Sequence, residues 1–140
     1  EPAFDPKPLE DPSIDWRVLF PRKGAPVLGP DARPAAGRRL GLVLLDGSWS
    51  QCSRMSRRVP GVADLPCVAL PPGPPSFWTV RTQHHAEGRS TFEAALGALR
   101  QIEDSPSIPV LYRAFALITA RFLFLKGTLR SPEIPAAWPV

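Results

Sequence analysis

Proline decides where regular structure can form in this chain, because 19 of its 140 residues are prolines and they cluster. Proline lacks a backbone N–H and biases the preceding residue away from the helical conformation. We therefore expect residues 1–15 to be an irregular N-terminal segment and residues 21–39 to be a loop. The chain has the length of one domain, so residues 16–140 are expected to share a single core.

Strands and helices are expected between the proline clusters, where apolar residues recur with regular spacing. Strands are predicted over residues 16–20, 40–45 and 65–71, and a further one over residues 76–80. Helices are predicted over about residues 48–58, 90–103 and 110–125. This alternation predicts an α/β fold with a mainly parallel sheet flanked by helices.

Apolar spacing also predicts which face each of the last two helices turns to the core. In the first helix the predicted core residues are Phe92, Ala95, Leu96, Leu99 and Ile102. In the second they are Leu111, Phe115, Ile118, Phe122 and Leu125. The continuous apolar run of residues 40–45 likewise predicts a strand that is covered on both faces.

Basic residues outnumber acidic ones, 17 against 13, and most of them are arginines. The guanidinium group suits bidentate contacts with phosphate, so nucleic acid is the favoured partner, although a GC-rich genome also produces an arginine bias. No run of eighteen apolar residues is present, and no membrane span is expected. Two cysteines are too few for a disulfide framework or a zinc site, so we expect reduced thiols, no metal and a cytoplasmic location.

The turn after the apolar run carries the first candidate site. Asp46 follows the strand at its carboxyl end, which is where ligands bind in parallel sheets. Gly47 permits a tight turn, and Ser48 with Gln51 forms a capping-box pattern at the start of a helix. Asp-Gly-Ser is also a common sequence in turns that connect a strand to a helix, and Trp49 could simply pack in the core. Both interpretations stay open on the local pattern alone.

The second candidate site comprises Arg81 and the helix start at Ser90. Arg81 ends the expected fourth strand, and Ser90 with Glu93 forms another capping-box pattern. The free amides of such a helix start can hold a carboxylate or a phosphate. His84 and His85 lack further metal-type partners and are interpreted as solvated loop residues.

Together these two segments resemble the DTW-domain family of tRNA-uridine aminocarboxypropyltransferases. The family motif Asp-x-Thr/Ser-Trp matches Asp46–Trp49, and the second signature, an arginine followed by a loop and Ser-Thr-x-Glu-Ala, matches Arg81 and Ser90–Ala94. Val18–Pro21 resembles the strand and proline that precede the motif. The likeness covers roughly residues 16–125. Two features depart from the family pattern: a serine replaces the commoner threonine, and no cysteine-rich segment lies within these residues.

The resemblance implies a SPOUT-like fold with a knotted C-terminal part that binds S-adenosylmethionine. Knots are otherwise very rare, so the resemblance is the whole basis for expecting one. The residues that it places at the cofactor are Gly47, Ser48, Leu70, Pro71, Arg81, Ser90, Thr91 and Glu93. Arg81 would hold the carboxylate of the methionine part, and the charge of Glu93 would orient its amino group.

The implied reaction moves the 3-amino-3-carboxypropyl group of S-adenosylmethionine to the ring nitrogen of a uridine in tRNA, with rRNA as the other possible substrate. The candidate catalytic residues are Asp46 and Trp49. Asp46 is expected to be a half-buried general base with a raised pKa, or a ligand of the donor's amino group. Trp49 would stack on a base or pack. Arg54, Arg57 and Arg58 share one helical face and would contact RNA phosphates, or solvent alone.

Two other functions remain open at this point. A SPOUT-type methyltransferase would share the fold and the cofactor but would place a different carbon at the nucleophile. An RNA-binding module without activity would bind tRNA but not S-adenosylmethionine. The oligomeric state is not predicted by the sequence.

Overall fold

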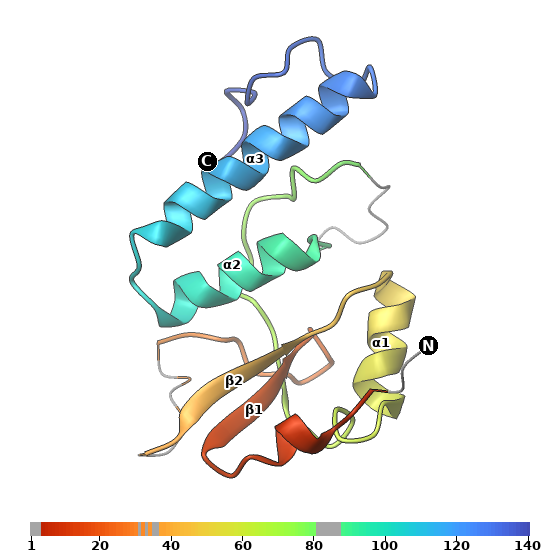
Figure 1. The fold of residues 1–140 in the computed structure, drawn as a ribbon, viewed down its shortest axis with the longest axis vertical. Helices are drawn as coiled ribbons and strands as arrows, with labels where there is room; N and C mark the ends of the chain where they lie inside the picture. The colour runs from red at the N-terminus through yellow and green to blue at the C-terminus, as the bar shows by residue number, and fades with distance from the viewer. Residues whose placement is uncertain (1–3, 31, 33, 35–36, 81–87) are drawn as a thin grey trace. The chain divides into compact units, whose positions relative to one another are not determined.

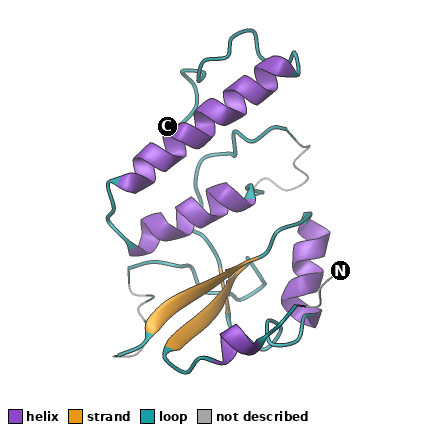
Figure 2. Cartoon of the chain, in the orientation of Figure 1, coloured by secondary structure: helices purple, strands orange, loops and turns teal. Residues whose placement is uncertain are grey.

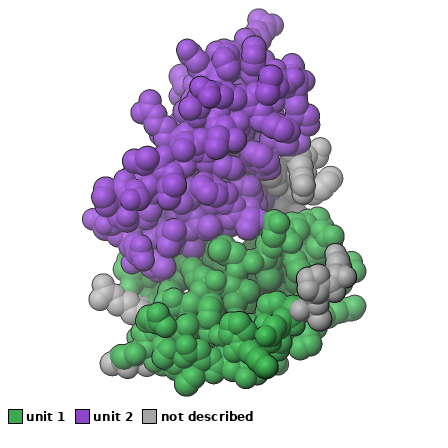
Figure 3. Space-filling model, in the orientation of Figure 1, with its two compact units in different colours: residues 1–71 green, residues 72–140 purple. Residues whose placement is uncertain are grey.

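The structure is a computed structural model that describes residues 4–30, 32, 34, 37–80 and 88–140 (Figure 2). These residues form two compact units, residues 1–71 and residues 72–140 (Figure 3). The boundary between the units falls within the proline-rich stretch at residues 71–75. Each unit has its own arrangement of elements, and each is described in turn.

The first unit contains a three-stranded parallel sheet, whose two long strands are labelled in Figure 1. Its strands are β1 (Ile14–Leu19), β2 (Arg39–Leu44) and β3 (Cys67–Val68), in the order β2-β1-β3. All six residues of β1 pair with β2, from Ile14 opposite Arg39 to Leu19 opposite Leu44. The predicted α/β class and parallel pairing are therefore confirmed. The predicted strand over residues 65–71 is reduced to β3 and one isolated bridge.

One side of this sheet packs on the helix α1 (Trp49–Arg58) and on the loop that follows it. The buried core of the unit comprises Val18, Phe20, Cys52, Val62 and Cys67. A short 3-10 helix, η1 (Lys7–Glu10), lies within the predicted irregular segment. Gly61, with a φ of 81°, approaches Pro6 of this segment so closely that an added Cβ would lie 2.8 Å from the proline Cβ. The N-terminal segment therefore packs against the turn after α1.

Strand β2 differs from its prediction, because none of its residues is buried and it forms an edge of the sheet. The central position belongs to β1, whose Val18 is fully buried. The expectation that the apolar run would be covered on both faces is therefore wrong. The indole of Trp16 on β1 lies across Gly41 of β2, and a Cβ added to Gly41 would come within 2.4 Å of Trp16 Cε3. The glycine thus makes room for the tryptophan ring.

The second unit contains two helices, α2 (Thr91–Ile102) and α3 (Ser107–Leu125). The predicted strand over residues 76–80 is absent, and this segment is a loop. The loop nevertheless enters the core, because Phe77 is 4% exposed and stacks on Trp138 with ring centroids 4.7 Å apart. The ring of Tyr112 meets the Phe77 ring edge-on. An aromatic cluster, and not a strand, therefore fixes this segment.

The core face of α3 also differs from its prediction. Leu111, Ile118, Phe122 and Leu125 are 43%, 62%, 43% and 82% exposed. The buried residues of this helix are Ile108, Ala116, Thr119, Ala120 and Leu123. Small side chains let the helix approach its neighbours closely, and the Thr119 hydroxyl donates to the Phe115 carbonyl at 2.8 Å, which permits its burial. Because both faces of α3 are apolar, spacing alone did not distinguish them.

By length and apolar composition alone, α3 is the one helix among the described residues that would suffice to cross a membrane. Core helices of soluble proteins meet the same criterion.

The core face of α2 was predicted in part. Leu96 is buried, whereas Phe92 is 41% exposed, and its ring centroid lies 4.7 Å from that of Phe115. Glu93 and Ala98, which were not predicted in the core, are buried.

Candidate functional site

The turn at Asp46 has the structure that the sequence predicted for it. Strand β2 ends at Leu44, and α1 begins at Trp49 with Ser48 as its N-cap. The capping box is complete, because Gln51 N–H donates to Ser48 Oγ at 3.4 Å and Ser48 N–H donates to Gln51 Oε1 at 2.7 Å. Gly47 lies against this box, where an added Cβ would be 3.2 Å from the Gln51 side chain. The backbone at the motif is therefore held by local hydrogen bonds.

Asp46 itself is exposed, which corrects the expectation of a half-buried carboxylate. The physical reason is its position after an edge strand, beside which the described residues place no further strand. The thiol of Cys52 lies nearby and contacts the Leu45 carbonyl at 3.4 Å and the Gly47 carbonyl at 3.5 Å. Burial raises the pKa of Cys52, and the negative charge of Asp46 raises it further. The carboxylate of Asp46 thus lies near the Cys52 thiol, which stays protonated.

Trp49 is half-buried and packs against the strand end. Its ring lies 5.4 Å from that of Phe20, at an interplanar angle of 48°. The side chain also borders the core cluster of the first unit. Packing is therefore one role of Trp49, and stacking on a nucleobase stays a prediction.

The three arginines of α1 are all at the surface, as their helical spacing predicted. Arg54, Arg57 and Arg58 are exposed, and Arg57 is oriented by hydrogen bonds of 3.0 Å to the Ser53 carbonyl and hydroxyl. The half-buried Arg22 donates to the Ser56 carbonyl on the same helix. No described acidic side chain forms an ion pair with any of these arginines. Within the part of the chain that the structure describes, no ion pair therefore compensates the positive charge on the exposed face of α1.

The predicted cofactor residues of the first unit lie where the strands of its sheet end. Because the strands are parallel, the residues that follow β2 and β3 lie at the same, carboxyl-terminal end of the sheet, on either side of β1. Asp46 follows β2, and the half-buried Leu70 and Pro71 follow β3. Ligands of open α/β sheets bind at this carboxyl-terminal end of the strands.

The predicted residues of the second unit surround the start of α2. Ser90 is the N-cap, and its box with Glu93 is complete: Glu93 N–H donates to Ser90 Oγ at 3.2 Å, and Ser90 N–H donates to Glu93 Oε2 at 2.9 Å. Thr91, the first residue of the helix, is half-buried. Arg81, together with His84 and His85, lies outside the described residues. The predicted helix start is therefore confirmed, and the predicted role of Arg81 stays a prediction.

Two residues near Glu93 were missed by the sequence analysis. Ser76 Oγ donates to Glu93 Oε2 at 2.6 Å, although 17 residues separate the two. Burial raises the pKa of Tyr112, and the negative charge of Glu93 raises it further. No local pattern indicates such a contact, since Ser76 was expected in a strand and Tyr112 did not belong to the predicted core face of its helix.

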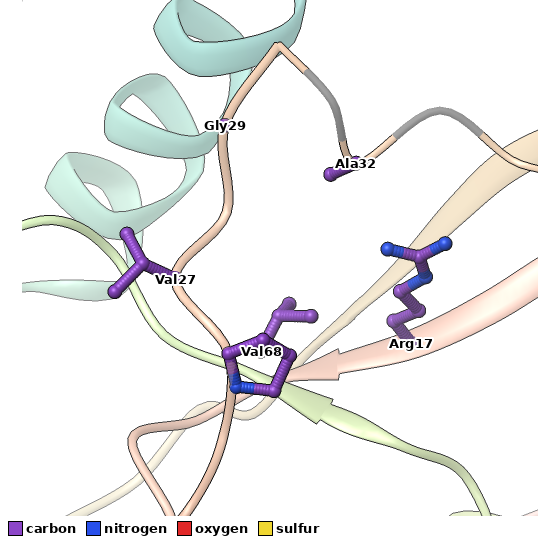
Figure 4. A pocket seen from close by; sticks show the side chains of 6 residues that line it. Arg17, Val27, Gly29, Ala32 and Val68 are labelled. Atoms are coloured by element: carbon purple, nitrogen blue, oxygen red, sulfur yellow. The ribbon is translucent and has the colours of Figure 1, made fainter.

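A pocket of about 300 Å³ lies elsewhere in the first unit (Figure 4). Its lining includes Arg17, Val27 and Val68, and none of the predicted site residues. Figure 4 shows the Arg17 guanidinium on one side of the hollow and Val27 on the other. The guanidinium is paired with Asp15 at 2.7 Å, so its charge is compensated. Within the described residues no group of histidine, cysteine and acidic side chains could hold a metal ion.

A family model described as DTW domain matches residues 5–123, which is most of the chain. The match includes both capped helix starts, at Ser48 and at Ser90. No match was found among curated proteins or among solved structures.

Proposed function

The chain belongs to the DTW-domain family, and from that premise we propose that it is an RNA-modifying transferase. The proposed reaction moves the 3-amino-3-carboxypropyl group of S-adenosylmethionine to the ring nitrogen of a uridine in tRNA, or in rRNA, and releases methylthioadenosine. The observation that carries this proposal is the position of Asp46. It is an exposed carboxylate at the carboxyl end of a parallel strand, directly before a capped helix, in the family motif.

The chemistry requires a base and a well-aligned donor. The carbons bound to the sulfonium are all activated, so the group that moves is the one placed in line with the nucleophile. The uridine imide becomes nucleophilic when it loses its N–H proton, and Asp46 is the proposed acceptor of that proton. A new N–C bond then forms as the C–S bond breaks, and the sulfur leaves as a neutral thioether. The exposure of Asp46 makes its carboxylate accessible to an incoming base.

Trp49 is proposed to combine packing with stacking. Its ring packs against that of Phe20, with centroids 5.4 Å apart. The side chain is half-buried, and stacking of uracil or adenine on it would contribute about 1–3 kcal/mol.

The residues for donor binding are proposed for each unit by itself, first those of the first unit and then those of the second. The residues in this role are Gly47, Ser48, Leu70, Pro71, Arg81, Ser90, Thr91 and Glu93. The hydroxyls and carboxylate at the start of α2 fit a ligand that carries an amino group, because Glu93 presents a buried negative charge there. A SPOUT-like, knotted C-terminal part is a component of this proposal.

The exposed face of α1 is proposed to position the RNA. Arg54, Arg57 and Arg58 are free of described ion pairs and can approach the phosphate backbone. Phosphate contacts fix the register of the RNA and do not specify the base. The uridine would therefore be chosen at the Asp46 turn, in a protein of the cytoplasm.

One binding measurement and one product analysis separate this function from its rivals. Calorimetry should show that the protein binds S-adenosylmethionine, which a purely RNA-binding module would not do. Chromatography after incubation with bulk tRNA should show methylthioadenosine. Release of S-adenosylhomocysteine instead would identify a methyltransferase.

A further inference from the structure

Large apolar side chains form a stripe along one face of α3, spaced three or four residues apart. The α3 stripe comprises Leu111, Phe115, Ile118, Phe122 and Leu125. Such spacing is typical of a face that packs on another helix. Phe115 is half-buried, but the other four side chains are between 43% and 82% exposed. The stripe therefore has the spacing of a helix–helix interface and the exposure of a surface.

The area of the α3 stripe is close to what a dimer interface needs. Val110 and Phe92 flank it and are 67% and 41% exposed. Together with them the stripe presents roughly 600 Å² of apolar surface, because a large apolar side chain has about 150–250 Å² in all. This is the upper end of the range of about 300–600 Å² for the largest apolar patch on a monomer. A stable interface takes about 800 Å² from each partner, roughly 60% of it apolar, so the stripe would supply its apolar part.

The side chains of the stripe also have a shape that suits a packed partner. The ring of Phe115 lies against those of Trp78 and Phe92, with centroids 5.4 Å and 4.7 Å apart. Trp78 also stacks on Phe122, at 6.4 Å. The more exposed Ile118 lies between these two held phenylalanines. Interlocking helices require such a fixed relief of protruding and recessed side chains, whereas a bilayer requires only apolar area.

The symmetry of the stripe favours a second copy of this chain as the partner. Ile118 is the middle residue, with Leu111 seven residues before it and Leu125 seven residues after it. A two-fold axis near Ile118 therefore places Leu111 of one copy opposite Leu125 of the other, so that apolar residues meet throughout. Helices related by this axis run antiparallel. The two exposed Arg121 side chains then lie about 9 Å apart along the helix, instead of side by side as in a parallel pair.

We propose that the α3 stripe is the interface of a homodimer, in which the α3 helices of two copies pack antiparallel about a two-fold axis near Ile118. The interface lies within the second unit. It includes none of the residues proposed for catalysis, donor binding or RNA binding, so it stands independently of the proposed reaction. Its area is at the low end for a stable complex, which corresponds to a dissociation constant of roughly micromolar size.

Sedimentation of the whole chain from low to high micromolar concentration tests the dimer. The mass should rise from 15.3 kDa to twice that value. Ile118→Glu places two like charges at the axis, which should weaken association by at least about a hundredfold. Arg113→Glu is the matched control, because it adds the same side chain at an exposed position of α3 outside the stripe, and it should still dimerise. Circular dichroism should show that both variants remain folded, since both side chains are largely exposed.

Single cysteines locate the axis without disrupting the interface. On mild oxidation, Ile118→Cys should form a disulfide-linked dimer, because its two copies meet at the axis. Leu125→Cys alone should not, whereas a mixture of Leu111→Cys and Leu125→Cys should form the mixed dimer. The native Cys52 and Cys67 are buried, so they should contribute little to this reaction.

Three results would overturn the inference. The first is an unaltered chain that stays monomeric at high micromolar concentration, and the second is an Ile118→Glu variant that dimerises as well as the unaltered chain. The third is cross-linking of Leu125→Cys alone as readily as Ile118→Cys, which would indicate a parallel pair. A monomer that binds vesicles of phosphatidylcholine and phosphatidylserine, and loses this binding with Ile118→Glu, would identify a membrane surface as the partner instead.

Discussion

Two leucines near the end of α3 provide a matched test of which face of this helix is buried. Leu123 is 2% exposed and Leu125 is 82% exposed, although they lie two residues apart on the same helix. Leu123→Ala removes a fully buried side chain and leaves a cavity, which costs about 2–5 kcal/mol. Full burial of a leucine contributes about 1.5–3 kcal/mol, so the covered fifth of Leu125 corresponds to roughly 0.3–0.5 kcal/mol. The two variants should therefore differ several-fold in their loss of stability.

Urea unfolding of both variants measures this difference. Leucine and alanine both have high helix propensity, so the helix itself contributes little to the comparison. With a typical slope of about 2 kcal/mol per molar urea, Leu123→Ala should lower the unfolding midpoint by at least about 1 M. The midpoint of Leu125→Ala should move by roughly a quarter of that or less. Equal losses, or a larger loss at Leu125, would refute the assignment of the buried face and restore the face that the sequence predicts.

Further substitutions test the first unit. Asp46→Asn is expected to change stability by no more than about 0.5 kcal/mol, because the side chain is exposed, and to abolish most transfer activity; near-normal turnover would exclude Asp46 as the base. The same change should lower the pKa of Cys52, which lies above its ordinary value of 9.0, and alkylation of the thiol at a series of pH values measures this; an unaltered profile would contradict the proximity of the two groups. Gly41→Ala should destabilise the protein by about 1–3 kcal/mol, because its Cβ would overlap Trp16, whereas Gly29→Ala meets no atom within 4 Å and should be nearly silent in thermal unfolding. Simultaneous replacement of the α1 arginines by alanine should weaken RNA binding and reduce the slope of its salt dependence by about 0.7–0.9 per lost phosphate contact, and an unchanged slope would mean that this face meets only solvent. The residues in that variant are Arg54, Arg57 and Arg58.

The helix starts were predictable because their signals are local. Ser48 and Ser90 each stand three residues before a glutamine or glutamate, and both boxes formed as expected. Strand β1 was located two residues late and β2 one residue late, yet their parallel pairing followed from the alternation of elements. The turn at Asp46 could therefore be placed from the sequence at the correct end of the sheet.

Features that depend on tertiary packing could not be predicted. The buried face of α3 includes Ala116 and Ala120, whose small side chains allow close approach, whereas apolar spacing gives more weight to bulky residues. The segment at Phe77 has strand-like composition, but it is held by stacking on Trp138 instead of by a neighbouring strand. Ser76 meets Glu93 across 17 residues, so only the folded chain reveals that contact.

The central claim is tested most directly by the product formed on RNA. The purified protein is incubated with S-adenosylmethionine and bulk tRNA, and the nucleosides are then analysed by mass spectrometry. The proposed function predicts a uridine that has gained one 3-amino-3-carboxypropyl group, formed in equal amount with methylthioadenosine and absent with Asp46→Asn. A methylated nucleoside, or tRNA that remains unmodified while S-adenosylmethionine is bound, would contradict it.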